Sequence, residues 1–89
     1  MKTSYFEFGE VYATAEANAL LSDEEKLQLL TWHGQLKGGE LCRADQEANR
    51  YALKHQLRIL SRFFLNGQSY YVITEADRSY TTIMLVEEY

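Results

Sequence analysis

The stretch from residue 58 to residue 74 reads RILSRFFLNGQSYYVIT, and it decides the fold. Its centre, Asn66-Gly67, is the strongest short signal for a two-residue hairpin turn, and residues rich in β-branched and aromatic types flank it. Leu53, Leu57, Leu60 and Phe64 also keep helical spacing, so one long helix through Phe64 is the competing interpretation. The turn signal favours two antiparallel strands over that helix.

A two-residue turn sets the register of the whole hairpin. It places Leu65 opposite Gln68, and each further pair follows from the strand period. The expected pairs are Phe63 with Tyr70, Ser61 with Val72, Leu60 with Ile73, Ile59 with Thr74 and Arg58 with Glu75. This register gives reasonable side-chain pairs on both faces of the hairpin. The pair of Arg58 with Glu75, for example, joins opposite charges across the two strands.

Two further strands are expected outside the hairpin. Residues 80–86 read YTTIMLV, a composition typical of a sheet, and the turn at residues 75–79 joins them to the hairpin. Near the N-terminus, residues 5–12 alternate aromatic with charged or small residues, which predicts a half-buried strand with a bulge at Gly9.

Three helices are expected between the first strand and the hairpin. Thr14 can cap a short helix over residues 15–21, and Ser22 with Glu25 forms a capping box that begins a second one. Trp32 is expected to anchor the end of that second helix in the core. The third helix is expected from about residue 44 to residue 55.

These elements predict one α+β domain over residues 1–89, because a chain of 89 residues is long enough for one core and too short for two. The order is β-α-α-α-β-β-β. We expect an antiparallel sheet of three to four strands with two to three helices packed on one face.

Charge is unevenly distributed along a chain of net charge −4, with acidic ends and a basic middle. The acidic balance argues against general binding to phosphate backbones, and it suits contact with a basic protein surface. No apolar run is long enough to span a bilayer, and the start of the chain lacks the apolar core of a signal peptide. We therefore expect a cytoplasmic protein with no membrane contact.

Catalytic and metal-binding patterns are not found. Cys42 is the single cysteine, so a multi-cysteine zinc motif is excluded, and His33 and His55 do not have the spacing of a zinc-binding helical pair. We read His33 as a helix-end residue and His55 as part of a helix face. The sequence predicts a protein that is not an enzyme and that needs no metal or cofactor.

The C-terminal stretch, residues 73–89, reads ITEADRSYTTIMLVEEY. It resembles the "ITEADRSxTTILLPEEY" ending of a family of small plasmid-related proteins carried on bacterial mobile elements, and upstream residues such as Asp45 and Asn49 also match. The chain departs from that family at Val86, where proline is usual, and at residues 33–41, which lack its GDWG motif. The resemblance implies a mobile-element setting and no particular activity.

Two groups of candidate binding residues follow from the pattern. The first combines the charged turn with neighbouring tyrosines, since exposed tyrosine is typical of protein interfaces. Its members are Glu75, Asp77, Arg78, Tyr70, Tyr71 and Tyr80. The second is the basic set of the central segment. Its members are Arg43, Arg50, Lys54, Arg58 and Arg62.

The first group favours a non-enzymatic binding protein that inhibits a host defence complex, of anti-CRISPR or anti-restriction type, by occluding a surface that holds nucleic acid. Its partner would be a host or phage protein complex, and a homodimer is left open. The alternative, from the second group, is a nucleic-acid-binding accessory or regulatory protein of a plasmid. The structural alternative to the first group is an ordinary charged turn with tyrosines that line a sheet, and the alternative for the uneven charge is that it simply keeps a small protein soluble.

Overall fold

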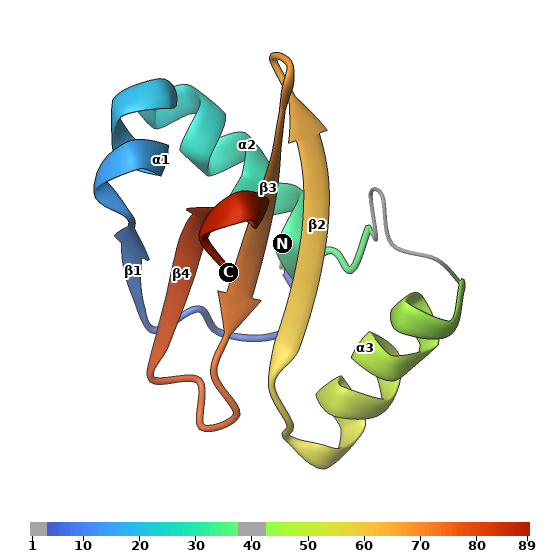
Figure 1. The fold of residues 1–89 in the computed structure, drawn as a ribbon. Coiled ribbons are helices and arrows are strands. Elements are labelled where there is room, and N and C mark those ends of the chain that lie inside the picture. Colours follow the sequence, from blue (N-terminus) through green and yellow to red (C-terminus); the bar gives the residue numbers. More distant parts are fainter. Residues whose placement is uncertain (1–3, 38–42) are drawn as a thin grey trace.

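The computed structural model describes residues 4–37 and 43–89 and contains three α-helices and a four-stranded sheet (Figure 1). The elements in chain order are β1 (Glu10–Ala13), α1 (Ala15–Leu20), α2 (Asp23–Gly34), α3 (Arg43–His55), β2 (Ile59–Leu65), β3 (Gln68–Thr74), β4 (Tyr80–Leu85) and the 3₁₀ turn η1 (Val86–Glu88). The predicted α+β class and the order β-α-α-α-β-β-β are confirmed.

The hairpin of β2 and β3 lies at one side of the sheet, whose strand order is β1-β4-β3-β2. Its predicted register is confirmed from the pair of Leu65 with Gln68 to the pair of Ile59 with Thr74. Asn66 and Gly67 have φ of 52° and 82°, the left-handed values that this tight turn requires. The alternative of a continuous helix through Phe64 is therefore wrong.

The sheet is mixed, because β1 pairs with β4 in parallel and the other pairs are antiparallel. The first strand is also shorter than the predicted span of residues 5–12, since it begins only after Gly9. Gly9 has a φ of 65° and turns the chain, so that Phe6 and Phe8 pack into the core instead of extending the strand. Strand direction was missed because local patterns carry no information on which edge β1 joins.

One face of the sheet is the core face. Its side chains alternate with outward ones along each strand, and they pack against Ala17 and Leu21 at α1 and Leu29 of α2. Phe63, Tyr70, Val72, Ile83 and Leu85 supply the strands' part of this cluster. Figure 1 shows α2 behind the sheet and η1 in front of it, so the two faces are covered differently.

The third helix packs along the outer edge of β2. The Asn49 side-chain amide donates to the Leu60 carbonyl at 2.5 Å, and its oxygen accepts from the Leu60 amide at 3.1 Å. Leu60 lies in a non-hydrogen-bonded pair of the hairpin, so these two backbone groups point away from β3. Asn49 thus replaces a neighbouring strand at this point, and Ala52 packs beside Ile59.

A buried polar chain runs through the core from α2. His33 is 0% exposed, and its Nδ1 and Nε2 lie 2.7 Å from the Ser61 hydroxyl and 2.8 Å from the Thr74 hydroxyl. The Thr74 hydroxyl lies 2.6 Å from that of Thr81, which donates to the Phe8 carbonyl at 2.8 Å. His33 is therefore a central core residue as well as the helix-end residue that the sequence indicated.

Candidate functional site

We call the face of the sheet opposite α1 and α2 the open face. Strand parity places outward side chains of all four strands on it, and η1 with Tyr89 crosses it. The outward side chains that are exposed or half-buried are Glu10, Tyr12, Leu60, Arg62, Phe64, Ser69, Tyr71, Tyr80, Thr82 and Met84. Two parts of this face carry distinct chemistry, one on the side of β1 and β4 and one on the side of β2.

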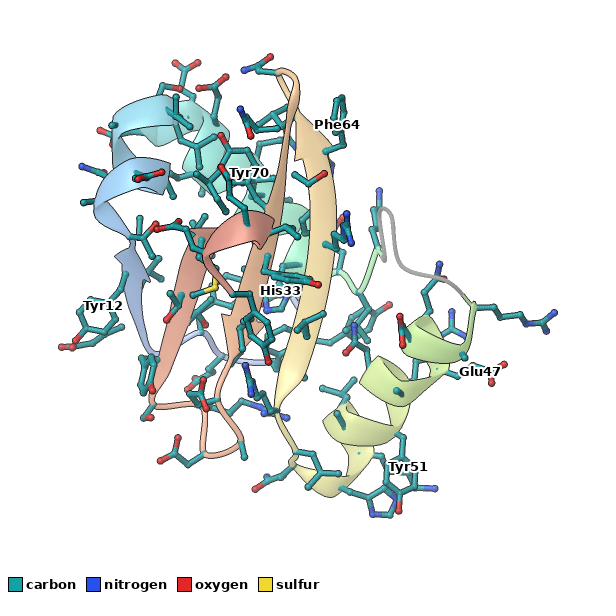
Figure 2. All side chains as sticks on the ribbon, in the orientation of Figure 1. Tyr12, His33, Glu47, Tyr51, Phe64 and Tyr70 are labelled. Atoms are coloured by element: carbon teal, nitrogen blue, oxygen red, sulfur yellow. The ribbon has the colours of Figure 1, made fainter. Side chains whose placement is uncertain are left out.

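The first part is an acidic tyrosine patch, which we define as Glu10, Tyr12, Glu75, Asp77 and Tyr80. Glu10 and Tyr80 are partners in the parallel ladder, and the rings of Tyr12 and Tyr80 lie 5.9 Å apart in an edge-to-face contact. They are 52% and 41% exposed. Figure 2 shows Tyr12 projecting away from the body of the molecule. Large aromatic surface is therefore presented among carboxylates.

A hydrogen bond within the patch sets the state of its outermost tyrosine. The Tyr12 hydroxyl donates to Glu10 Oε2 at 2.5 Å. This hydrogen bond to a nearby carboxylate raises the pKa of Tyr12 above its usual value. The bond also fixes the position of the phenol beside the negative charge of Glu10.

The turn between β3 and β4 holds the remaining carboxylates in place. Asp77 accepts from the Ser79 hydroxyl at 2.6 Å and from the Ser79 amide at 3.0 Å, and these bonds lower the pKa of Asp77. Asp77 is thus an ionised, exposed group with a defined position. An open hollow of about 360 Å³ lies beside it, lined by Glu75, Ala76, Asp77, Ser79 and Tyr80.

Arg78 points inward from the same turn. Its Nη1 donates to the carbonyls of Leu57, Glu75 and Ala76 at 2.7, 3.1 and 3.2 Å, and its Nη2 donates to the Ala52 carbonyl at 3.4 Å. The guanidinium also lies 5.7 Å from the centre of the Phe6 ring. Arg78 therefore ties the end of α3 to the turn and is committed within the fold.

The second part is the arginine groove, which runs between α3 and the open face and has a volume of about 310 Å³. We define it by its lining residues, Asp45, Ala48, Asn49, Arg58, Leu60, Arg62 and Tyr71. At one end, α3 contributes the exposed carboxylate of Asp45. The opposite wall is built by Leu60 and Arg62 of β2, Tyr71 of β3, and Arg58, which directly precedes β2.

Two arginines and two tyrosines form a continuous series of contacts beside this groove. The guanidinium carbon of Arg62 lies 6.0 Å from the centre of the Tyr71 ring, and that ring lies 5.2 Å from the ring of Tyr89. Arg58 lies 5.7 Å from the Tyr89 ring centre, and its Nη2 donates to the Tyr89 hydroxyl at 3.2 Å. The expected cross-strand pair of Arg58 with Glu75 is wrong, since the ladder begins at Ile59 and Thr74.

The six residues of the first predicted group are separated by the structure. Glu75, Asp77 and Tyr80 lie together in the acidic tyrosine patch, and Tyr71 lines the arginine groove. Tyr70 is 1% exposed, because its place opposite Phe63 and Leu85 turns its ring into the core. Tyr70 is labelled in Figure 2. Tyr70 is thus excluded from any contact surface.

The basic group is also divided. Arg58 and Arg62 line the groove together: Arg62 lies on β2, and Arg58, four residues earlier, directly precedes that strand. Arg43 is paired with Glu47, its Nε 3.5 Å from Oε1, and it does not line the groove. Arg50 and Lys54 are exposed on α3, outside the groove lining.

Glu10 and Asp45 were not predicted as site residues, and the pairing of Tyr89 with Arg58 was also missed. Only the parallel register brings Glu10 to Tyr80, and only the packing of α3 brings Asp45 to Arg58. The alternation of side chains along the first strand, which places Tyr12 on the outward face, was the one sequence feature that could have indicated this site. Cys42 lies outside the described residues.

Within residues 4–37 and 43–89, no group of three or more histidine, cysteine, aspartate or glutamate side chains is arranged to hold a metal ion. The described helices include none with the length and apolar character to cross a membrane. In comparisons with known proteins, no family model, no curated protein and no solved structure matches this chain. The resemblance of the C-terminal motif to plasmid-related proteins thus stays a prediction.

Proposed function

We propose that this chain is a non-enzymatic binding protein whose acidic tyrosine patch covers a basic surface of a partner protein. The observation that carries the proposal is the exposed pair of Tyr12 and Tyr80 with carboxylates on either side. Tyrosine contributes large contact area at low entropic cost, and the carboxylates supply attraction and register toward a basic partner.

The C-terminal motif suggests which partner to test. If the chain shares the mobile-element setting of the proteins that it resembles, a host or phage complex of restriction or CRISPR type is the expected target. Such complexes hold nucleic acid on basic surfaces, and a bound acidic protein would occlude that surface. Competition with nucleic acid for the partner is therefore the expected mechanism of inhibition.

The test compares two variants with the same change in charge. Glu10→Lys with Glu75→Lys reverses the patch, and Glu16→Lys with Glu47→Lys reverses two exposed carboxylates on α1 and α3. Each protein is used to capture partners from host lysate, and the captured complex is then purified. Its binding to labelled nucleic acid is measured with each variant added.

We expect the unchanged protein and the α1/α3 control to displace nucleic acid from the complex, and the patch variant to lose at least tenfold in potency, on the order expected for truncated hot spots. Equal displacement by both variants would remove the patch from the interface. If the captured complex binds nucleic acid equally well with and without the protein, that result would contradict the occlusion mechanism.

A further inference from the structure

We propose that the arginine groove binds a nucleoside phosphate, either free or as part of a single-stranded nucleic acid. This site is separate from the acidic tyrosine patch, and it does not depend on the function proposed for that patch. The proposal rests on two guanidinium groups and the Tyr71 ring, which line one groove, and on the Tyr89 ring, which contacts Arg58 and meets Tyr71 edge to face beside it.

The arginines supply the phosphate-binding part of the site. Arg58 and Arg62 come from the same side of one chain segment, and both line a groove of about 310 Å³. A guanidinium that lies over an aromatic ring keeps its N–H donors in its own plane, and those donors match the oxygens of a phosphate. The guanidinium carbons of Arg58 and Arg62 lie 5.7 Å and 6.0 Å from the ring centres of Tyr89 and Tyr71, so aromatic contacts restrict both side chains.

The tyrosines supply the surface for a base. Tyr89 is 67% exposed and its ring meets that of Tyr71 edge to face, so aromatic surface is accessible beside the arginines. Bases stack on such rings without strong sequence preference. The Asp45 carboxylate, at the α3 side of the groove, can accept a hydrogen bond from a base amino group or a sugar hydroxyl.

The same features favour a single nucleotide unit over other anions. The groove volume is at the lower end of the range for small-molecule sites, about 300 to 1,000 Å³, which suits one nucleotide. An acidic protein segment offers a carboxylate but no planar ring system for Tyr89. A duplex needs a longer basic track, whereas Arg50 and Lys54 lie outside this groove in a protein of net charge −4.

The first experiment measures fluorescence anisotropy of a labelled oligothymidylate of about 12 nucleotides. The double variant Arg58→Gln with Arg62→Gln is compared with Arg43→Gln with Lys54→Gln, which removes the same charge outside the groove. We expect the groove variant to bind at least tenfold more weakly and the control to lose threefold or less. Two phosphate contacts predict a slope of about −1.4 for log affinity against log salt.

A second variant keeps the charge and tests stacking. Tyr89→Ala changes a residue that is 67% exposed, and we expect about five- to hundredfold weaker binding. Circular dichroism checks that each variant is folded. Competition by uridine monophosphate separates the two sources, since full competition indicates a free nucleotide and weak competition indicates a strand.

Absence of binding by either probe at about 50 mM salt would overturn the proposal. Equal losses in the two double variants would also overturn it, because they would reflect overall charge alone. A polyglutamate peptide that binds in place of the oligonucleotide, and is lost in the groove variant, would assign the groove to an acidic protein segment.

Discussion

At the scale of single residues, the hydroxyl chain around His33 defines its protonation. The Thr81 hydroxyl gives its only proton to the Phe8 carbonyl, so it must accept from Thr74. Thr74 has then used its own proton, and it accepts from Nε2–H of His33. Nδ1 is left as the acceptor for the Ser61 hydroxyl. The neutral imidazole of His33 therefore makes both hydrogen bonds, to Ser61 and to Thr74. A protonated imidazole would be buried without a counter-ion among these groups.

This arrangement predicts a loss of stability in acid. Burial, with a smaller contribution from the Arg78 charge, lowers the pKa of His33 to about 3. Below the ordinary pKa of about 6.5 the unfolded chain binds a proton that the folded chain refuses, so stability falls as the pH falls. We expect the free energy of unfolding to decrease by about 3 kcal/mol between pH 7 and pH 4.

Urea unfolding at both pH values measures this change. His33→Gln should lose most of the pH dependence, whereas His55→Gln, at an exposed position of α3, should keep it. Carboxylates of lowered pKa such as Asp77 add acid sensitivity to all three proteins, so the difference between variants isolates His33. The same pH dependence in His33→Gln and the unchanged protein would contradict this account.

Two glycines with left-handed backbone predict unequal costs. A Cβ on Gly9 would lie 2.2 Å from the Ser79 carbonyl oxygen, whereas a Cβ on Gly67 would meet nothing within 4 Å. Gly9→Ala should destabilise the protein by about 3 kcal/mol or more, since it combines backbone strain with a backbone clash. Gly67→Ala should cost about 1 kcal/mol from the turn alone. Similar urea midpoints for both variants would show that the contact with Ser79 can relax.

At the scale of elements, β2 is an edge strand whose outer side is covered in part by a helix. Asn49 pairs with both backbone groups of Leu60, and Ala52 packs near Ile59. An uncovered edge is a template for pairing with another chain, and α3 reduces that hazard at this position. The same packing creates the arginine groove, because α3 forms its second wall.

Asn49→Ala should therefore loosen α3 from the sheet. The change leaves two backbone groups of Leu60 without their partner, and we expect a loss of about 2 kcal/mol in the free energy of unfolding. Hydrogen exchange at the Leu60 amide should become faster. Arg50→Ala, at the next and exposed position, should change neither quantity, and unchanged exchange in Asn49→Ala would show that water replaces the side chain without cost.

At the scale of the whole molecule, the fold separates charge across one surface. The carboxylates of the acidic tyrosine patch lie on the side of β1 and β4, and the arginines of the groove lie on the side of β2. Such a division lets one small domain present opposite fields to different parts of a partner or to two ligands. Arg78 connects these two sides of the molecule, because it links the end of α3 with the turn that carries Glu75 and Asp77.

Arg78→Lys is expected to destabilise the molecule although the charge is kept. A lysine cannot reproduce a planar group that donates to carbonyls of Ala52, Leu57 and Glu75. We expect a loss of about 2 kcal/mol, measured by urea unfolding. Arg50→Lys, on the outer surface of α3, is the matched control, and equal stability of both variants would show that these carbonyls are satisfied by water.

Features that depend on neighbours in the chain could be predicted from the amino-acid pattern. The Ser22 and Thr14 caps, the Asn66-Gly67 turn and the register from Leu65–Gln68 to Ile59–Thr74 were predicted correctly, because local backbone chemistry and strand period decide them. The candidate site was predicted in part for the same reason, since Arg58 with Arg62 and Glu75 with Asp77 are close in sequence.

Only the tertiary structure decided the features that join distant segments. The parallel pairing of β1 with β4, the burial of Tyr70 and His33, and the inward direction of Arg78 each depend on contacts between segments far apart in the chain. A local sequence pattern is the same whether a strand pairs in parallel or antiparallel. It also does not decide whether a tyrosine lies on the buried or the exposed face of the sheet. The choice is made when the apolar face of the sheet is covered by α1 and α2, because burial there gains more free energy than any local preference.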